Sequence, residues 1–151
     1  MYRKLKIFTL VICILLSGMI LISCSNSSNT LKNGYYTAEV SEFDEHGWKE
    51  YISIYVSKNR IITVEYDAKN PSGLLKSWDV NYMREMNVIS GTYPNEYTRV
   101  YSDMLLDKQT ADDVNVIAGA THSYDTFCML ADAVIECART GEKSVVYVDA
   151  H

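Results

Sequence analysis

The chain has 151 residues, with 14 basic and 19 acidic side chains and a formal net charge of −5. This acidic balance argues against nucleic acid as a partner, because such proteins need clustered positive charge to neutralise phosphates. A metal site is not expected either, since His46, His122 and His151 show no ligand spacing.

The first 23 residues have the order of a bacterial lipoprotein signal. A basic start with Arg3, Lys4 and Lys6 precedes the uncharged stretch IFTLVICILLSGMILIS, which is typical of a secretory signal and short for a membrane span. The segment LISC, ending at Cys24, resembles the lipobox, in which the cysteine is acylated and the chain is cut just before it. The alternatives are a retained membrane span or a cysteine that merely closes a hydrophobic run.

We therefore expect a signal peptide over residues 1–23, a lipidated tether over residues 24–32 and one folded domain over residues 33–151. Removal of the signal leaves 11 basic and 19 acidic residues, a net charge of −8. Such a chain would not adhere electrostatically to anionic lipid. The lipid on Cys24 would hold it in the bilayer, on the extracytoplasmic face of the cell membrane.

Three segments alternate apolar and polar residues, as half-buried strands do. In GYYTAEVSEF the alternation places Tyr36, Ala38 and Val40 on one face. The stretch EYISIYVSKNRIITVEY is typical of a hairpin with its turn at Lys58 and Asn59. The inward residues of this hairpin are predicted to be Ile52, Ile54 and Val56 on the first strand, and Ile62, Val64 and Tyr66 on the second.

Helical periodicity follows the strands. A short helix is predicted over residues 77–86, with Trp78, Tyr82 and Met86 facing inward. Pro94 suits the first position of the next helix. The apolar stripe of that helix is predicted to consist of Tyr97, Val100, Tyr101, Met104 and Leu105.

A last helix is predicted from about Ser123 to Arg139, ended by Gly141 in a left-handed conformation. Cys128 and Cys137 would lie on opposite sides of it, about 13.5 Å apart along its axis, so we expect no disulfide between them. The fold class is α+β, a small antiparallel sheet of about three strands followed by helices packed on one face. The inward residues of the last helix are predicted to be Phe127, Leu130, Ala131, Val134 and Ala138.

The stretch IAGATHS, residues 117–123, places Thr121 in the turn before the last helix. Unpaired N–H groups and the positive end of the helix dipole favour an anion there, phosphate in particular. Gly119 and Ala120 keep side-chain bulk away from the backbone. Local physics alone nevertheless favours a simpler role, in which Thr121 or Ser123 caps the helix.

The region from Asn33 to about Gly141 resembles the FMN-binding domain of small bacterial lipoproteins and of subunits of sodium-pumping quinone reductases. Its opening, NGYYTAEVSEFDEHGWKEYISIYVSKNRIITVEYDAKNPSGLLKS, resembles the lipoprotein branch. The segment DDVNVIAGATHS resembles the flavin-attachment motif, which usually ends in Ser-Gly-Ala-Thr with a Ser or Thr two positions on. Two residues depart from that motif: Ala118 replaces the usual Ser or Thr, and Asn115 replaces the usual Asp.

This resemblance implies a cofactor and its site. Thr121 would carry FMN as a phosphoester, while Gly119, Ala120 and Ser123 shape the phosphate site. A separate flavin transferase would attach the FMN, using FAD and Mg²⁺ and releasing AMP. The chain would then be an electron-transfer carrier serving a membrane partner, rather than an enzyme with its own substrate. The alternatives are flavin held without a covalent bond, and a lipoprotein that keeps the fold without flavin and binds a small ligand or a protein.

Overall fold

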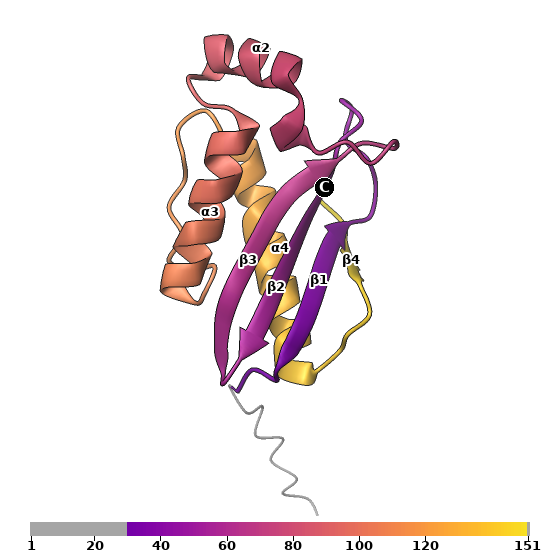
Figure 1. Cartoon of the computed structure of the whole chain (residues 1–151), viewed down its shortest axis with the longest axis vertical. Coiled ribbons are helices and arrows are strands. Elements are labelled where there is room, and N and C mark those ends of the chain that lie inside the picture. Colours follow the sequence, from indigo (N-terminus) through magenta and orange to yellow (C-terminus); the bar gives the residue numbers. More distant parts are fainter. Residues whose placement is uncertain (1–29, 151) are drawn as a thin grey trace, which may run out of the picture.

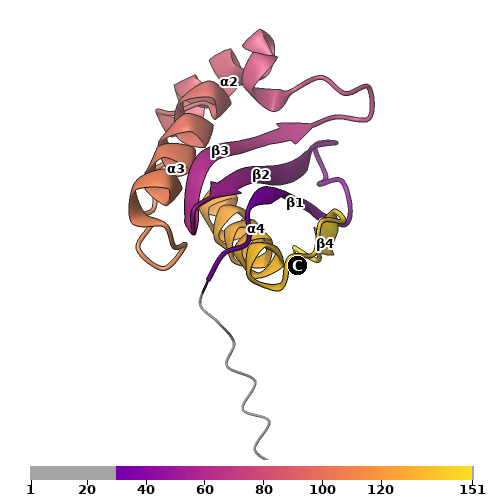
Figure 2. The same ribbon diagram turned by 60° about the horizontal axis from the view of Figure 1, so that its bottom comes forward.

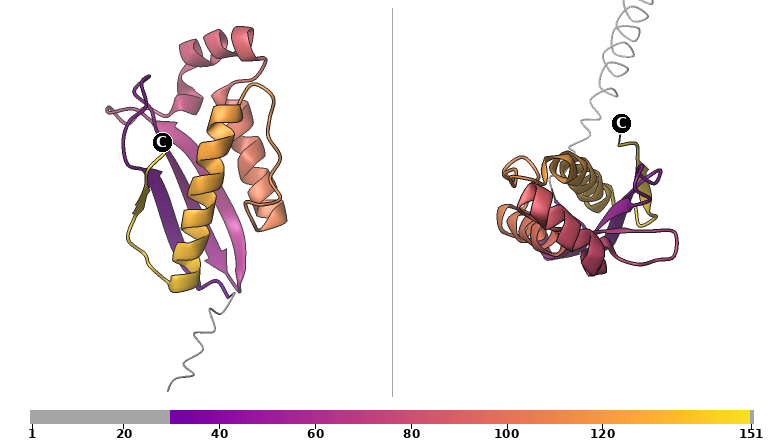
Figure 3. Two further views of the ribbon diagram at one scale, coloured as in Figure 1. Left: turned by 180° about the vertical axis from the view of Figure 1, so that it is seen from behind. Right: turned by 90° about the horizontal axis from the view of Figure 1, so that it is seen from above.

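The computed structural model describes residues 30–150, and the predicted signal peptide and Cys24 lie outside them. Helices α3 and α4 cover one face of a sheet, and α2 lies at one end of it (Figures 1 and 3). This arrangement confirms the α+β prediction. The elements in chain order are β1 (Gly34–Val40), β2 (Lys49–Ser57), β3 (Arg60–Lys69), a 3₁₀ turn η1 (Lys76–Trp78), α2 (Val80–Ser90), α3 (Pro94–Lys108), α4 (Thr121–Thr140) and β4 (Val146–Val148).

The sheet of the described chain has the strand order β3-β2-β1-β4. The first three strands pair antiparallel, as predicted. The fourth was not predicted: β4 runs parallel to β1, with Ala38 opposite Val146 and Val40 opposite Val148 (Figure 2). Three residues are too few to show an alternating pattern, so only the return of the chain after α4 reveals this strand.

The β2–β3 hairpin contains a bulge that corrects one core prediction. Val56 pairs with Ile61 rather than Ile62, and Ile61 is buried whereas Ile62 is exposed. The two turn residues, Lys58 and Asn59, both have positive φ, which is typical of a tight two-residue hairpin turn. The prediction of Ile62 as an inward residue was wrong because the bulge turns it to the outer face. The other predicted inward pairs of the hairpin are confirmed.

The segment before α2 also differs from the prediction. Asp79 caps α2 by accepting hydrogen bonds from the N–H groups of Asn81 and Tyr82. The helix therefore begins after Trp78, which is 69% exposed, so the prediction that Trp78 faces inward was wrong. No residue of α2 is buried. This helix contributes little to the core and lies on the surface at the end of the sheet.

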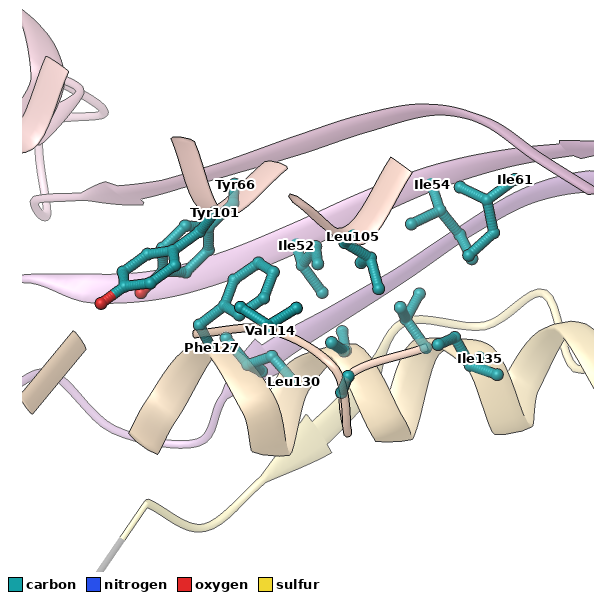
Figure 4. Packing of buried hydrophobic residues seen from close by; sticks show 14 of the residues in the cluster. Ile52, Ile54, Ile61, Tyr66, Tyr101, Leu105, Val114, Phe127, Leu130 and Ile135 are labelled. Carbon is teal, nitrogen blue, oxygen red and sulfur yellow. The ribbon is translucent and has the colours of Figure 1, made fainter. Parts of the chain in front are cut away.

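The core lies between the sheet and helices α3 and α4 (Figure 4). All five predicted inward residues of α4 are buried. In α3 the stripe is narrower than predicted, because Val100 is 37% exposed. Phe127 of α4 stacks on Tyr101 of α3 with ring centroids 5.2 Å apart. Tyr66 and Phe127 form a T-shaped pair with ring centroids 4.9 Å apart. These rings fix the first half of α4 against the sheet.

Helix α4 is longer than predicted but ends as expected. It begins at Thr121 and is ended by Gly141, whose φ is 82°. Cys137 is buried, Cys128 is half-buried, and both are free, which confirms that they form no disulfide. Over its 20 residues the helix spans about 30 Å, so its two ends lie at opposite ends of the domain (Figure 3).

Candidate functional site

The described chain begins at the end of the domain remote from the start of α4. The Leu31 N–H donates to Asn59 Oδ1 at 2.6 Å, and the Lys32 N–H donates to the carbonyl oxygen of Ala138 at 2.8 Å. Both contacts lie near the β2–β3 turn and the C-terminal end of α4, whereas α2 and the N-terminus of α4 lie at the other end (Figure 1). A tether joined at residue 30 would leave that other end free.

The turn that leads into α4 requires glycine. The Ala120 N–H donates to the carbonyl oxygen of Ile117 at 3.0 Å, and Gly119 has a φ of 82°, as the third residue of a type II turn does. A Cβ on Gly119 would collide with the backbone oxygen of Ser90. The absence of a side chain at Gly119 therefore lets the turn pack against the end of α2.

The N-terminus of α4 has no side-chain cap. Ala120 occupies the cap position, Thr121 is exposed as the first helical residue, and the hydroxyl of Ser123 instead contacts the carboxyl of Glu50 at 3.3 Å. The structure therefore does not support a capping role for Thr121 or Ser123. Within residues 30–150, the N–H groups of Thr121, His122 and Ser123 have no hydrogen-bond acceptor. The helix presents unpaired donors and the positive end of its dipole.

A cavity of about 300 Å³ adjoins this helix end. Gly119, Ala120 and Ser123 line one side of it, and Lys76 and Tyr82 line another. The structure thus brings together three of the four residues that the sequence predicted for a cofactor site.

Thr121, the fourth predicted residue, does not line this cavity. It is exposed at the first position of α4, directly before His122, which does line the cavity. Thr121 therefore lies on the surface beside the cavity rather than inside it.

A second cavity, of about 270 Å³, is also lined by His122. Phe43, Trp48 and Glu50 contribute to its lining, so it combines aromatic walls with one buried carboxyl. His122 lines both cavities, as do Asp44 and Glu45 of the loop between β1 and β2. The two spaces are therefore neighbours.

Lys76 places a cation at the first cavity. The residue is only 6% exposed, although lysine is rarely buried without a partner. Its Nζ lies 4.8 Å from the ring centroid of Tyr82 and 5.8 Å from that of Trp48, within cation–π range. Among the described residues, Lys76 has no ion pair and no hydrogen-bonded acceptor for its ammonium group. Sequence patterns did not single it out, because one lysine between loop residues carries no signal.

Glu50 is the buried acid of the second cavity. The hydroxyl of Tyr66 donates to its Oε2 at 2.8 Å, and the hydroxyl of Ser123 is the second donor. Burial raises the pKa of the Glu50 carboxyl, while the Tyr66 hydrogen bond and the charge of Lys76 act in the opposite direction. The alternation of β2 could have revealed this residue, because Glu50 stands two positions before the inward Ile52.

Comparison with known proteins identifies relatives of this chain. No protein-family model matches it. The 15 kDa lipoprotein of Treponema pallidum (strain Nichols) is 36% identical over 129 residues, which cover 85% of this chain and 90% of that protein. The crystal structure of the CPE2226 protein from Clostridium perfringens is 36% identical with a TM-score of 0.77, covering 80% of this chain and 98% of that one. A solution NMR structure from Clostridium thermocellum is 25% identical with a TM-score of 0.50, covering 80% and 100%.

The chain belongs to the family of the 15 kDa lipoprotein. Membership of a lipoprotein family supports the coarser part of the sequence prediction, a lipoprotein anchored to a membrane. No helix within residues 30–150 is long and apolar enough to cross a bilayer. The names of these relatives mention no flavin or electron transfer, so the resemblance to the FMN-binding domain stays a prediction.

Proposed function

We propose that this lipoprotein carries FMN at the N-terminus of α4, with its phosphate joined to Thr121, and transfers electrons on the extracytoplasmic face of the cell membrane. One observation carries the proposal. The uncapped N-terminus of α4 opens beside a cavity lined by the predicted residues Gly119, Ala120 and Ser123. Free N–H groups and the helix dipole together favour phosphate at such a position.

The residues present fit both parts of FMN. The phosphate would meet the unpaired N–H groups of the first turn of α4. The isoalloxazine ring needs a partly apolar bed, and Phe43 and Trp48 offer aromatic surface in the neighbouring cavity. The first cavity, of about 300 Å³, reaches the lower end of the range of small-molecule sites, and the neighbouring cavity adds about 270 Å³. Bound FMN would supply the redox chemistry, while the protein supplies orientation and electrostatics.

The covalent bond would form by phosphoryl transfer from FAD, catalysed by a flavin transferase with Mg²⁺. The hydroxyl oxygen of Thr121 would attack the flavin-bearing phosphorus of FAD. The bond from that phosphorus to the AMP half would break, AMP would leave, and the hydroxyl proton would pass to solvent or to a base of the transferase. This step involves no oxidation or reduction. The exposure of Thr121 supports the proposal, since a separate enzyme must reach its hydroxyl.

The test is to produce the full chain together with a flavin transferase and to measure its absorbance and intact mass. We expect the two visible absorbance bands of flavin to stay with the protein after denaturation. The mass should increase by that of FMN less one water. A colourless product of unmodified mass would overturn the proposal.

A second candidate function is a lipoprotein that binds a protein partner and has no redox role. The observation that favours it is the surface of α2, where the neighbouring residues Val88 and Ile89 are each 85% exposed. Exposed apolar groups of this size are typical of interaction surfaces when they lie together. This candidate predicts a colourless protein whose partner binding is lost when Val88 and Ile89 are changed to Ser.

A further inference from the structure

The cavity beside α4 is lined by a charged group, the ammonium group of Lys76, that forms no ion pair within the described chain. Lys76 is 6% exposed, and lysine side chains normally extend so that the ammonium group reaches water. Its ammonium group faces the rings of Tyr82 and Trp48, which attract cations but do not neutralise them. The ammonium nitrogen itself is not sealed off, because Arg139 Nε is the buried side-chain nitrogen or oxygen without a hydrogen-bond partner among the described residues. The ammonium group is therefore open to the cavity, where a ligand that supplies negative charge could pair with it.

We propose that Lys76 is the cation of an anion site that it shares with the N-terminus of α4, and that the anion is the phosphate group of the ligand. The inference rests on the proposed function and deepens it, because it assigns to the phosphate a binding residue, Lys76, that the sequence did not reveal. The two features come from different parts of the chain, since Lys76 belongs to η1 and the N–H groups to α4. They meet because Lys76, Gly119, Ala120 and Ser123 line the same cavity.

Glu50 does not take the place of that anion. Its two carboxyl oxygens accept from Tyr66 and Ser123, and within the described chain Lys76 forms no ion pair with it. The charge of Lys76 acts on Glu50 only through space. The ammonium group therefore keeps its donors for a group inside the cavity.

The loop acids that line the cavity do not neutralise Lys76 either. The side chain of Asp44 accepts from the backbone N–H groups of His46 and Trp48, at 2.9 and 2.7 Å, so it is used in the β1–β2 loop. Glu45 lies at the surface, with its Oε1 3.6 Å from the His46 ring. The donors at the cavity left without an acceptor among the described residues are the ammonium group of Lys76 and the N–H groups at the start of α4. A phosphate suits them, because its several oxygens can accept from an ammonium group and from neighbouring N–H groups at once.

The experiment compares FMN with riboflavin, which lacks only the phosphate. The full-length lipoprotein in detergent, made without a flavin transferase so that Thr121 is unmodified, is titrated with each flavin and followed by flavin fluorescence. Lys76→Met keeps the length of the side chain and removes its charge, and Lys76→Arg keeps the charge. Lys143→Met, at an exposed position after α4, is the matched control. Inorganic phosphate is the third probe, measured by the shift that it causes in the thermal unfolding temperature.

Loss of a charge-assisted contact should weaken FMN binding by Lys76→Met about ten- to hundredfold. Riboflavin binding should not change, Lys76→Arg should retain most of the preference for FMN, and Lys143→Met should match the parent. Phosphate should raise the unfolding temperature of the parent and not that of Lys76→Met.

Equal losses for FMN and riboflavin would overturn the inference, as would an unchanged FMN affinity or the absence of any phosphate effect on the parent. The outcome also separates this inference from the proposed function. Phosphate binding through Lys76 without any flavin binding would retain the anion site and reject the flavin. Normal covalent loading of Lys76→Met, together with unchanged affinities, would reject only the role of Lys76.

Discussion

The hydroxyl of Ser123 lies 3.3 Å from Oε1 of Glu50, so the first turn of α4 is tied to strand β2. A serine near a helix start usually caps its own helix, but the Ser123 hydroxyl donates a hydrogen bond to the buried carboxyl of Glu50 instead. The hydroxyl of Tyr66 completes the arrangement, 2.8 Å from the other carboxyl oxygen. One consequence is an open helix N-terminus, and the other is an acid whose proton affinity depends on burial.

Glu50 should make stability depend on pH. Burial raises the pKa of its carboxyl in the folded protein above the ordinary value, so the folded state binds this proton more tightly than the unfolded state does. The contribution to stability is full below the unfolded pKa and is lost as the pH rises through the folded pKa. Glu50→Gln mimics the protonated acid. We therefore expect the variant to gain stability relative to the parent as the pH rises above the ordinary carboxyl pKa of 4.5, by about 1.4 kcal/mol for each unit of pKa shift.

Urea unfolding of both proteins at a series of pH values measures this difference. Groups that titrate alike in the two proteins cancel in this comparison. Groups that interact with Glu50 do not have to cancel, and these are Lys76 on η1, His122 on α4, Tyr66 on β3 and Tyr97 on α3. The background His122→Gln serves as the control, because the charge of His122 acts on Glu50. A difference in unfolding free energy that does not change with pH would contradict the prediction.

The fold could be predicted where local patterns carry it. The alternation in β1 and β2 and the long apolar face of α4 place the same residues inward in the sequence and in the structure. Ile62 could not be placed, because the bulge depends on how the two strands pair. Trp78 was placed wrongly because an apolar residue just outside a helix matches the helical period as well as one inside it, and only the Asp79 cap decides.

The site could be predicted only in part, for a related reason. Gly119, Ala120 and Ser123 lie together in the sequence, so a local motif finds them. Lys76 and Glu50 are separated from them along the chain, and they approach the start of α4 only through tertiary packing. The alternation of β2 does place Glu50 on the inward face, but no sequence pattern shows that Lys76 or Glu50 lies beside the start of α4.

Lys76→Met should stabilise the protein while it weakens ligand binding. The substitution replaces a cation that has no direct counterion within residues 30–150 with an apolar side chain of similar length, at a residue that is largely buried. The change breaks no ion pair, so we expect a small gain in the free energy of unfolding. Thermal unfolding of the ligand-free protein checks this, with exposed Lys143→Met expected to be neutral. A clear loss of stability in Lys76→Met would mean that the ammonium group holds the fold together.

Gly119→Ala should destabilise the protein by more than its φ alone explains. The new Cβ would meet the backbone oxygen of Ser90, so the loss should be about 1 to 3 kcal/mol for strain and more if the turn cannot shift. Gly73→Ala is a matched control, since Gly73 has a φ of 84° and no heavy atom near its added Cβ. Denaturant unfolding of both variants separates the collision from the backbone effect. Equal losses would show that the contact with α2 does not matter.

Cys24→Ser should block lipid anchoring. Acylation needs the thiol, and signal cleavage follows acylation, so the variant should remain a precursor of full length. Intact-mass measurement on membrane fractions distinguishes the two forms. Normal processing of the variant would rule out the lipobox interpretation.

Thr121→Val should abolish covalent flavin and leave stability almost unchanged. Valine keeps the shape of threonine but lacks the oxygen nucleophile, so no phosphoester can form. A capping threonine would lose about 0.5 to 2 kcal/mol on this change, but Thr121 is exposed and no side chain caps α4. Intact mass after production with a flavin transferase measures the loss of covalent flavin, and urea unfolding measures the change in stability. Thr121→Ser keeps the oxygen and should retain some flavin. Flavin that stays bound to denatured Thr121→Val would show that another residue carries it, whereas a stability loss without any flavin in the parent would favour a purely structural threonine.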